Sequence, residues 1–138
     1  MELRLMLYLL DSVILIDHFN GVKAATCYLQ KHAQEIAISV ITRAEVLTGF
    51  DAEREALAKA LLAKIHHRSV TRDAADLAAR LRRRYRWKLP DALQAAIALN
   101  NQLKPITRNT KDFDPKQHSF VVVPYTLNEP ASQTLSLP

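Results

Sequence analysis

The sequence is poor in glycine and cysteine, and it contains no long apolar segment. Only Gly21 and Gly49 are glycines, so neither common type of glycine-rich phosphate-binding loop can be built. Cys27 is the only cysteine, which excludes a disulfide framework and a cysteine-based zinc site and is typical of a reducing compartment. No stretch approaches the roughly 20 apolar residues that a membrane span needs. We therefore expect a cytoplasmic protein that does not bind membranes.

The charge of the chain is unbalanced toward the basic side. Its 138 residues carry 19 lysines and arginines against 14 acids, which gives a net charge of +5. A basic excess of this size favours a polyanionic partner without identifying one. A hydrophobic content of 49% is ordinary for one soluble domain, and the length suffices to bury a core.

Short apolar segments alternate with helical patterns along the chain. Strands are predicted at 5–10, 36–39, 69–70, 104–107 and 120–123, and helices at 12–19, 22–32, 42–50, 51–67, 72–86 and 89–99. This alternation predicts an α/β fold with three α/β/α layers around a central, mainly parallel sheet. We place the domain in residues 1–124 and expect the polar residues 125–138 to form a loose tail or an arm docked on a partner.

The segment 89–99 predicts a helix that is buried nearly all round, because it is apolar apart from two side chains. Pro90 suits the first helical turn, where its missing N–H would have no partner. Asp91 lies in the same turn and Gln94 is the other polar residue. The helix dipole favours an acid there by under about 1 kcal/mol, which explains Asp91 without any function.

Three further acids follow predicted strands, and each has a structural explanation. Asp11 can cap the next helix, Glu45 can form a capping box with Thr42, and Asp112 can form a turn with Asn109. These explanations do not account for their shared location, because parallel strands bring their carboxyl ends to one edge of the sheet. Carboxylates gathered there raise one another's pKa unless a cation lies between them. All-oxygen ligands suit Mg²⁺ or Mn²⁺.

The acids lie within four short motifs whose order and spacing form a recognisable set. The motifs are residues 10–17 (LDSVILID), 41–45 (ITRAE), 89–96 (LPDALQAA) and 106–113 (ITRNTKDF). In these motifs the chain resembles the PIN-domain ribonucleases, and within them the VapC-type toxins of toxin–antitoxin pairs. The resemblance covers about residues 9–123. It implies a PIN-like fold, a metal-dependent endoribonuclease, a homodimer, and a cognate antitoxin whose C-terminal segment occupies the groove.

The resemblance also implies roles for individual residues. The expected catalytic residues are Asp11, Glu45, Asp91 and Asp112, of which the first three would bind Mg²⁺ or Mn²⁺, while Ser12 and Asn109 are expected at the substrate. Ser12 keeps a hydroxyl beside the first acid, whereas Val13 replaces the small polar residue that the family usually has there. Either Asp112 or Asn109 supplies the fourth group of the site.

The helix predicted at 72–86 has an apolar stripe and an arginine-rich opposite side. We expect Arg83 and Arg84 to bind the phosphates of an RNA substrate, and Trp87 to stack on an unpaired base. A solvated surface is the structural alternative. The sequence does not specify the RNA, and tRNA and rRNA both remain open.

Two other functions are compatible with the pattern. A non-catalytic RNA-binding or adaptor domain of the same fold would need no metal. A phosphoacceptor receiver-type domain fits less well, because Lys104 precedes its strand and no strand in the middle of the chain ends in aspartate. Two residues inside the motifs have alternative interpretations. We expect Asp17 at the surface rather than as a partner of a site residue. Thr107 and Arg108 could contact substrate or a bound ion, and for Thr107 we favour ordinary hydrogen bonds at the strand end.

Overall fold

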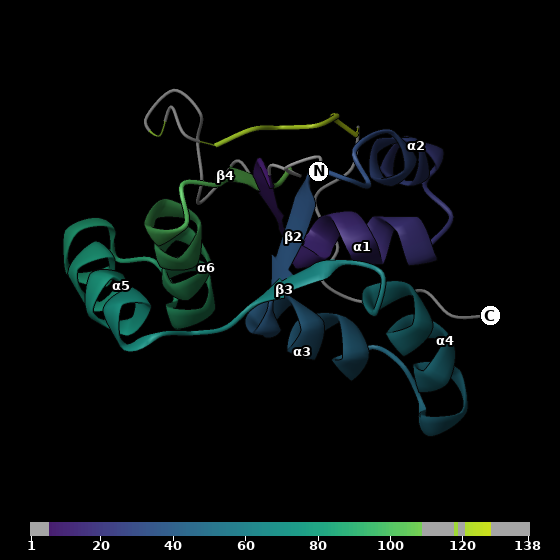
Figure 1. Ribbon diagram of the computed structural model, residues 1–138, viewed down its shortest axis with the longest axis horizontal. Helices are drawn as coiled ribbons and strands as arrows, with labels where there is room; N and C mark the ends of the chain where they lie inside the picture. The colour runs from purple at the N-terminus through teal and green to yellow at the C-terminus, as the bar shows by residue number, and fades with distance from the viewer. Residues whose placement is uncertain (1–5, 109–117, 119–120, 128–138) are drawn as a thin grey trace, which may run out of the picture.

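Four short strands form a parallel sheet at the centre of the computed structural model, which describes residues 6–108, 118 and 121–127 (Figure 1). In order along the chain, the elements are β1 (Tyr8–Leu10), α1 (Ser12–Phe19), α2 (Lys23–Lys31), β2 (Ile36–Ser39), α3 (Val40–Thr48), α4 (Ala52–Leu62), β3 (His66–Arg68), α5 (Arg72–Tyr85), α6 (Leu89–Asn100) and β4 (Lys104–Ile106). The strand order is β3-β2-β1-β4, and each neighbouring pair is parallel.

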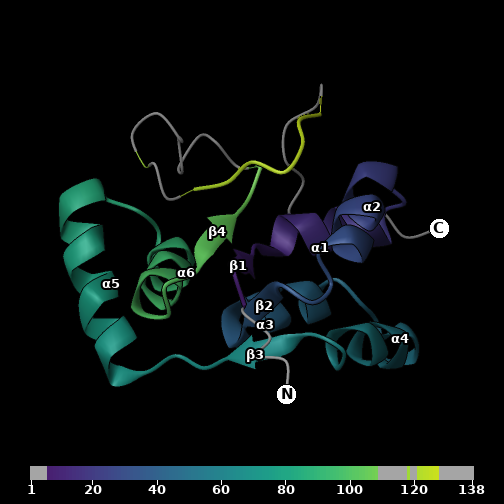
Figure 2. The same cartoon turned by 45° about the horizontal axis from the view of Figure 1, so that its top comes forward.

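Helices cover both faces of this sheet (Figures 1 and 2). Leu9 and Ala37 point to the face that packs against α5 and α6. The next residue of each strand, Leu10 and Ile38, points to the opposite face, where α1, α2, α3 and α4 pack. Because side chains alternate along a strand, this two-sided burial explains why the strands are apolar throughout. The predicted α/β/α fold class is confirmed.

The buried helix α6 forms where the sequence predicts it. Pro90 lies in its first turn, and its small side chains pack tightly against the sheet. Thr71 caps α5, since its hydroxyl oxygen accepts from the N–H of Ala74 at 3.1 Å. No helix among the described residues is both long and apolar enough to cross a membrane.

The structure differs from the prediction around the third strand. The helix predicted to reach residue 67 ends at Leu62, and the strand lies at His66–Arg68 instead of 69–70. These three residues have no apolar pattern typical of a strand. They form one because β2 offers its free edge as a parallel partner, which is a tertiary effect.

The last predicted strand, 120–123, is represented among the described residues by one bridge between Val122 and Ile106. The N–H of Val122 donates to the carbonyl of Pro105 at 2.9 Å, and the N–H of Thr107 donates to the carbonyl of Val122 at 3.1 Å. The segment 121–127 therefore runs beside β4.

Candidate functional site

The candidate site lies at the carboxyl edge of the sheet, where β1 ends at Leu10 and β4 ends at Ile106. These strands are neighbours, and the N–H of Asp11 donates to the carbonyl of Ile106 at 2.9 Å. Asp11 and Thr107 consequently leave the sheet side by side. Both are placed by the register of two parallel strands.

Neutral hydrogen-bond donors hold both carboxylate oxygens of Asp11. As the N-cap of α1, Asp11 accepts at Oδ1 from the N–H of Ser12 at 2.8 Å. Its Oδ2 accepts from the hydroxyl of Thr107 at 2.7 Å. Burial raises the pKa of Asp11, and these hydrogen bonds counter part of that rise. Thr107 does make hydrogen bonds at the strand end, as expected, and the structure adds that its hydroxyl binds this acid.

Glu45 reaches the same location from α3. The capping box predicted for it does not form, because α3 begins one turn earlier with Ser39 as its N-cap; the hydroxyl oxygen of Ser39 accepts from the N–H of Thr42 at 3.1 Å. Burial is the largest cause that raises the pKa of Glu45 to about 7, followed by the negative charge of Asp11. The negative charge of Asp91 raises the pKa of Glu45 by a smaller amount, and a hydrogen bond from Ser12 lowers it.

The structure thus brings four of the predicted site residues together: Asp11, Ser12, Glu45 and Asp91. Within the part of the chain that the structure describes, neither Asp11 nor Glu45 forms an ion pair with a basic side chain. Among residues 6–108, 118 and 121–127, no group of three or more His, Cys, Asp or Glu side chains is arranged to hold a metal ion. Asn109 and Asp112 lie outside the described residues.

A buried network of neutral side chains ties α6 to the edge of the sheet. The hydroxyl of Ser39 donates to Gln94 Oε1 at 2.6 Å, and Gln94 Nε2 donates to the carbonyl of Leu10 at 3.2 Å. Leu10 directly precedes Asp11, and Gln94 lies three residues after Asp91 on α6. The network therefore holds α6, which carries Asp91, against β1, which leads into Asp11. The sequence held a signal for it, since Gln94 is the polar exception inside an apolar helix.

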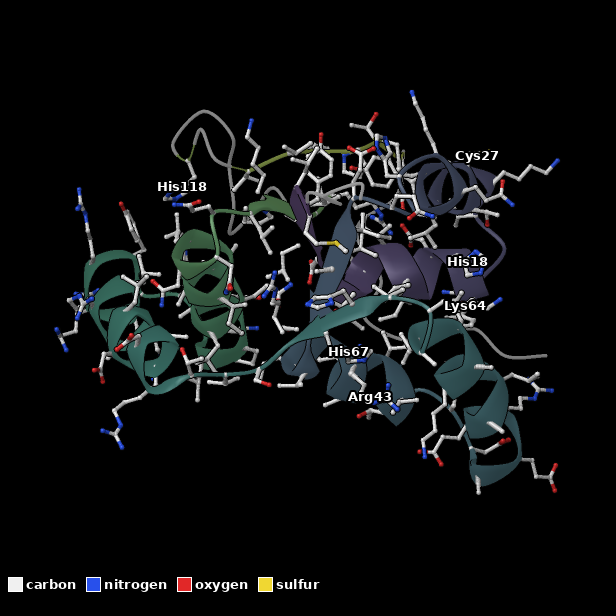
Figure 3. The ribbon with its side chains drawn as sticks, in the orientation of Figure 1. His18, Cys27, Arg43, Lys64, His67 and His118 are labelled. Carbon is white, nitrogen blue, oxygen red and sulfur yellow. The ribbon has the colours of Figure 1, made fainter. Side chains whose placement is uncertain are left out.

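A second link holds α3 in place. One guanidinium nitrogen of Arg43, on α3, lies 3.1 Å from Nε2 of His67, on β3 (Figure 3). The Nδ1 of His67 lies 2.9 Å from the carbonyl of Ile65, so Nδ1 is assigned as the donor and Nε2 as the acceptor from Arg43. Because Arg43 is two residues before Glu45, this contact anchors the helix that carries the acid.

An ionic cluster of Asp17, Arg108 and Tyr125 lies at the other end of α1. Arg108 donates to Asp17 through two nitrogens, at 2.6 and 2.8 Å, and the hydroxyl of Tyr125 donates to Asp17 at 2.7 Å. Asp17 is 2% exposed, so its predicted surface location is wrong. The preceding run Val13 to Ile16, apolar on every side of a short helix, was the signal for its burial.

The basic residues predicted to bind RNA are separate from these clusters. Arg83 is exposed on α5 and lines an open hollow of about 510 Å³. Arg84 is also exposed, with its guanidinium 5.2 Å from the centroid of the Tyr85 ring. Trp87 is 7% exposed and stacks on Tyr85 at 4.8 Å, with the His118 ring 5.0 Å away. The prediction that Trp87 presents a face to a base is wrong, because its ring belongs to the core.

The arrangement of strands and acids agrees with a known family. The family model described as "PIN domain" matches residues 8–116. The chain belongs to the PIN-domain family. The matched residues include all four motifs, and the predicted family is confirmed.

Individual relatives agree with this assignment. The chain is 33% identical over 113 residues to Ribonuclease VapC19 of Mycobacterium tuberculosis, which covers 76% of this chain and 90% of that protein. Among solved structures, a toxin–antitoxin complex from Klebsiella pneumoniae contains a chain with a TM-score of 0.79 and 37% identity, covering 87% of this chain and 99% of that one. VapBC2 from Rickettsia felis, bound to a promoter DNA fragment, shares the fold at 22% identity and a TM-score of 0.71, covering 85% and 96%.

Proposed function

We propose that this PIN-domain protein is a metal-dependent endoribonuclease and the toxin of a toxin–antitoxin pair. The observation that carries the proposal is that Asp11 and Asp91 lie close enough to Glu45 for their charges to act on it. Burial first, and then repulsion from these two acids, raises the pKa of Glu45 to about 7. The similarity to Ribonuclease VapC19 supports RNA as the substrate. The similarity to the Klebsiella pneumoniae toxin–antitoxin complex supports a cognate antitoxin as the partner.

Mg²⁺ or Mn²⁺ would be held by Asp11, Glu45 and Asp91, and either Asp112 or Asn109, which lie outside the described residues, would supply the fourth group of the site. The donor chemistry fits these ions, because every ligand is a carboxylate oxygen. The repulsion that Asp11 and Asp91 exert on Glu45 also fits, since a cation between them would remove its cause. Such an ion polarises the scissile phosphate and lowers the pKa of a bound water.

The protein's own side chains orient the reaction. The two hydrogen bonds on Asp11, from Ser12 and Thr107, fix the direction of its oxygens before substrate binds. The carboxylate of Glu45 would orient the water that attacks phosphorus in line with the leaving ribose oxygen and would accept a proton from it. Ser12 and Asn109 would contact the reacting nucleotide.

Arg83 and Arg84 would hold the RNA backbone, because guanidinium groups bind phosphate oxygens in pairs. Their exposure on α5 and the net charge of +5 support this role. A homodimer and a cytoplasmic location complete the proposal. The choice among RNA substrates, tRNA and rRNA included, is part of what the experiments below must decide.

The direct test is cleavage of a single-stranded RNA oligonucleotide by the purified protein with Mg²⁺, with Mn²⁺ and with EDTA. We expect cleavage with either ion, none with EDTA, and none by Asp91→Asn. Asp76→Asn is the matched control, because Asp76 is an exposed acid on α5. Equal cleavage by Asp91→Asn and Asp76→Asn would overturn the proposal. RNA binding without Mg²⁺ binding in calorimetry would favour the non-catalytic adaptor.

A second test addresses the toxin role. Expression of the wild-type chain in a bacterial host should arrest growth, and expression of Asp91→Asn should not. The neighbouring reading frames should include one for a small protein, and its co-expression should restore growth. Normal growth with an active, well-expressed wild-type protein would refute the toxin role while leaving the nuclease activity intact.

A further inference from the structure

We propose that Asp17, Arg108 and Tyr125 form a positioning cluster that holds Thr107 against Asp11, so that the segment 121–127 is a working part of the metal site. The inference rests on the proposed function, because it assigns a task to residues outside the acidic group. It concerns positioning residues, since none of the three contacts the acids at the strand edge.

The cluster is built to be rigid. Asp17 Oδ2 accepts from Arg108 Nε at 2.6 Å and from the hydroxyl of Tyr125 at 2.7 Å, while Oδ1 accepts from the other guanidinium nitrogen at 2.8 Å. The side chains of Arg108 and Asp17 are 6% and 3% exposed. A bidentate pair in so dry a location has one geometry, because any other leaves a buried charge without its partner.

Thr107 is held in place both by its neighbour Arg108 and by the segment 121–127. Arg108 follows it in the chain, and the N–H of Thr107 donates to the carbonyl of Val122 at 3.1 Å. Val122 lies three residues before Tyr125, so the same segment holds Thr107 through its backbone and Arg108 through Asp17. The Thr107 hydroxyl, 2.7 Å from Asp11 Oδ2, is therefore held in a fixed place.

The contacts close a ring. Asp11 and Asp17 belong to the same short helix, Asp17 holds Arg108, and Arg108 is bonded covalently to Thr107, which returns to Asp11. Tyr125, from the segment 121–127, is attached to this ring through its hydrogen bond to Asp17. The family model ends at residue 116, so Tyr125 lies beyond the matched part of the chain. The structure thus joins a residue outside the family's matched span to the first acid of its site.

The test removes one oxygen atom. Tyr125→Phe deletes the hydroxyl on Asp17 and leaves the ring and the ion pair in place. Tyr28→Phe is the matched control, because Tyr28 is also a half-buried tyrosine that packs against the same core cluster as Tyr125. A role in fold stability alone predicts similar behaviour of the two variants at the metal site.

The first readout needs no metal. Hydrogen exchange of the backbone amides of Asp11 and Thr107 in EDTA reports how firmly the two strand ends are held. We expect both amides to exchange about 2- to 10-fold faster in Tyr125→Phe, the range that one hydrogen bond supplies, and to be unchanged in Tyr28→Phe. Unchanged exchange at both amides in Tyr125→Phe would overturn the inference.

The second readout is the affinity for Mg²⁺ alone, measured by calorimetry on the full chain. We expect Thr107→Val to weaken binding by about 10- to 100-fold, as removal of a ligand's hydrogen-bond partner does, and Tyr125→Phe by about 2- to 10-fold. If Tyr125 acts through Thr107, the double variant binds no more weakly than Thr107→Val. A merely structural role predicts that the two losses multiply.

The outcomes separate this inference from the proposed function. Wild-type affinity for Mg²⁺ in Tyr125→Phe, or multiplied losses in the double variant, would overturn the positioning role and leave the nuclease proposal standing. Absence of Mg²⁺ binding by the wild-type protein would overturn the proposed function, and the positioning role with it. Coupled losses with faster exchange at Asp11 and Thr107 would establish the positioning role.

Discussion

Helix α1 carries two aspartates whose surroundings are opposite. Asp17 faces a guanidinium and a phenol, so its charge is neutralised inside the protein. Among the described residues, Asp11 receives hydrogen bonds from the neutral donors Ser12 and Thr107, and its negative charge acts on that of Glu45. The same residue type on the same helix therefore has two functions, and the partners rather than the depth of burial decide which.

The Asp17 cluster and the acids around Asp11 differ in whether their charges are balanced within the protein. The Asp17 cluster is complete, because each charge has its partner within the protein. The acids around Asp11 are held together against their repulsion, which is the arrangement expected of a group that awaits a cation. The predictions that follow test this contrast.

The largest effect is expected from Asp11→Asn. An amide cannot replace the charged metal ligand, and metal polarisation is worth several kcal/mol, so RNA cleavage should fall by about 10³-fold or more. Asparagine caps a helix as well as aspartate, so the cap of α1 should survive. Stability in EDTA, measured by urea unfolding, should be equal to the wild-type value or higher, because a charge that repels Glu45 is gone. A large loss of stability would contradict the contrast.

Asp17→Asn should behave in the opposite way. It leaves the buried guanidinium of Arg108 without a counter-charge, which should lower the free energy of unfolding by about 3–5 kcal/mol. Asp51→Asn makes the same chemical change at the exposed N-cap of α4 and should cost under about 0.5 kcal/mol. Urea unfolding of both variants measures the difference. Equal stabilities would show that the Asp17 cluster is not an essential ion pair.

Gln94→Leu tests the neutral network beneath the site. It removes the 2.6 Å acceptor of the Ser39 hydroxyl and one donor to the Leu10 carbonyl, which leaves both groups with their longer contacts to Thr42, and it should cost about 1–3 kcal/mol. Cleavage should fall by about 10-fold, because the strand end that precedes Asp11 loses its tie to α6. Gln30→Leu, on the exposed side of α2, is the control for adding a leucine. Unfolding and cleavage measured on both variants decide the point; unchanged cleavage by Gln94→Leu would make the network purely structural.

The smallest effect is a pH dependence of stability in the metal-free protein. The pKa of Glu45 rises from an ordinary 4.5 to about 7 on folding, so the folded state keeps its proton over a range in which the unfolded state has lost it. Stability from this group is therefore highest below pH 4.5 and declines until about pH 7, where it levels off.

The measurement is urea unfolding in EDTA between pH 5 and 8 for the wild type and for Glu45→Gln. The wild type should lose stability relative to the variant as the pH rises. Glu53→Gln, at an exposed position of α4, should follow the wild-type curve. Parallel curves of unfolding free energy against pH for all three proteins would show that the pKa of Glu45 is not raised by folding. The burial and the repulsion assigned to Glu45 would then be wrong.

Much of the fold was predictable from local chemistry. The apolar run after Pro90 predicted α6, and the alternation of strands and helices predicted the parallel sheet. The location of Asp11 and Glu45 after strands predicted that they meet. By contrast, β3 could not be predicted, because His66–Arg68 becomes a strand only through the free edge of β2. Thr107 and Asp17 could not be assigned for the same reason, since their partners are distant in the chain.

The sequence by itself determined the family and the layers, because apolar periodicity, cap residues and motif spacing are local properties. Only the tertiary structure decided which aspartate is neutralised within the protein and which is left facing other acids. Asp11 and Asp17 are six residues apart, yet their charges are set by Thr107, Glu45 and Arg108, which come from other elements. A carboxylate's chemistry depends on the groups within a few ångströms, and folding, not the order of residues, brings those groups together.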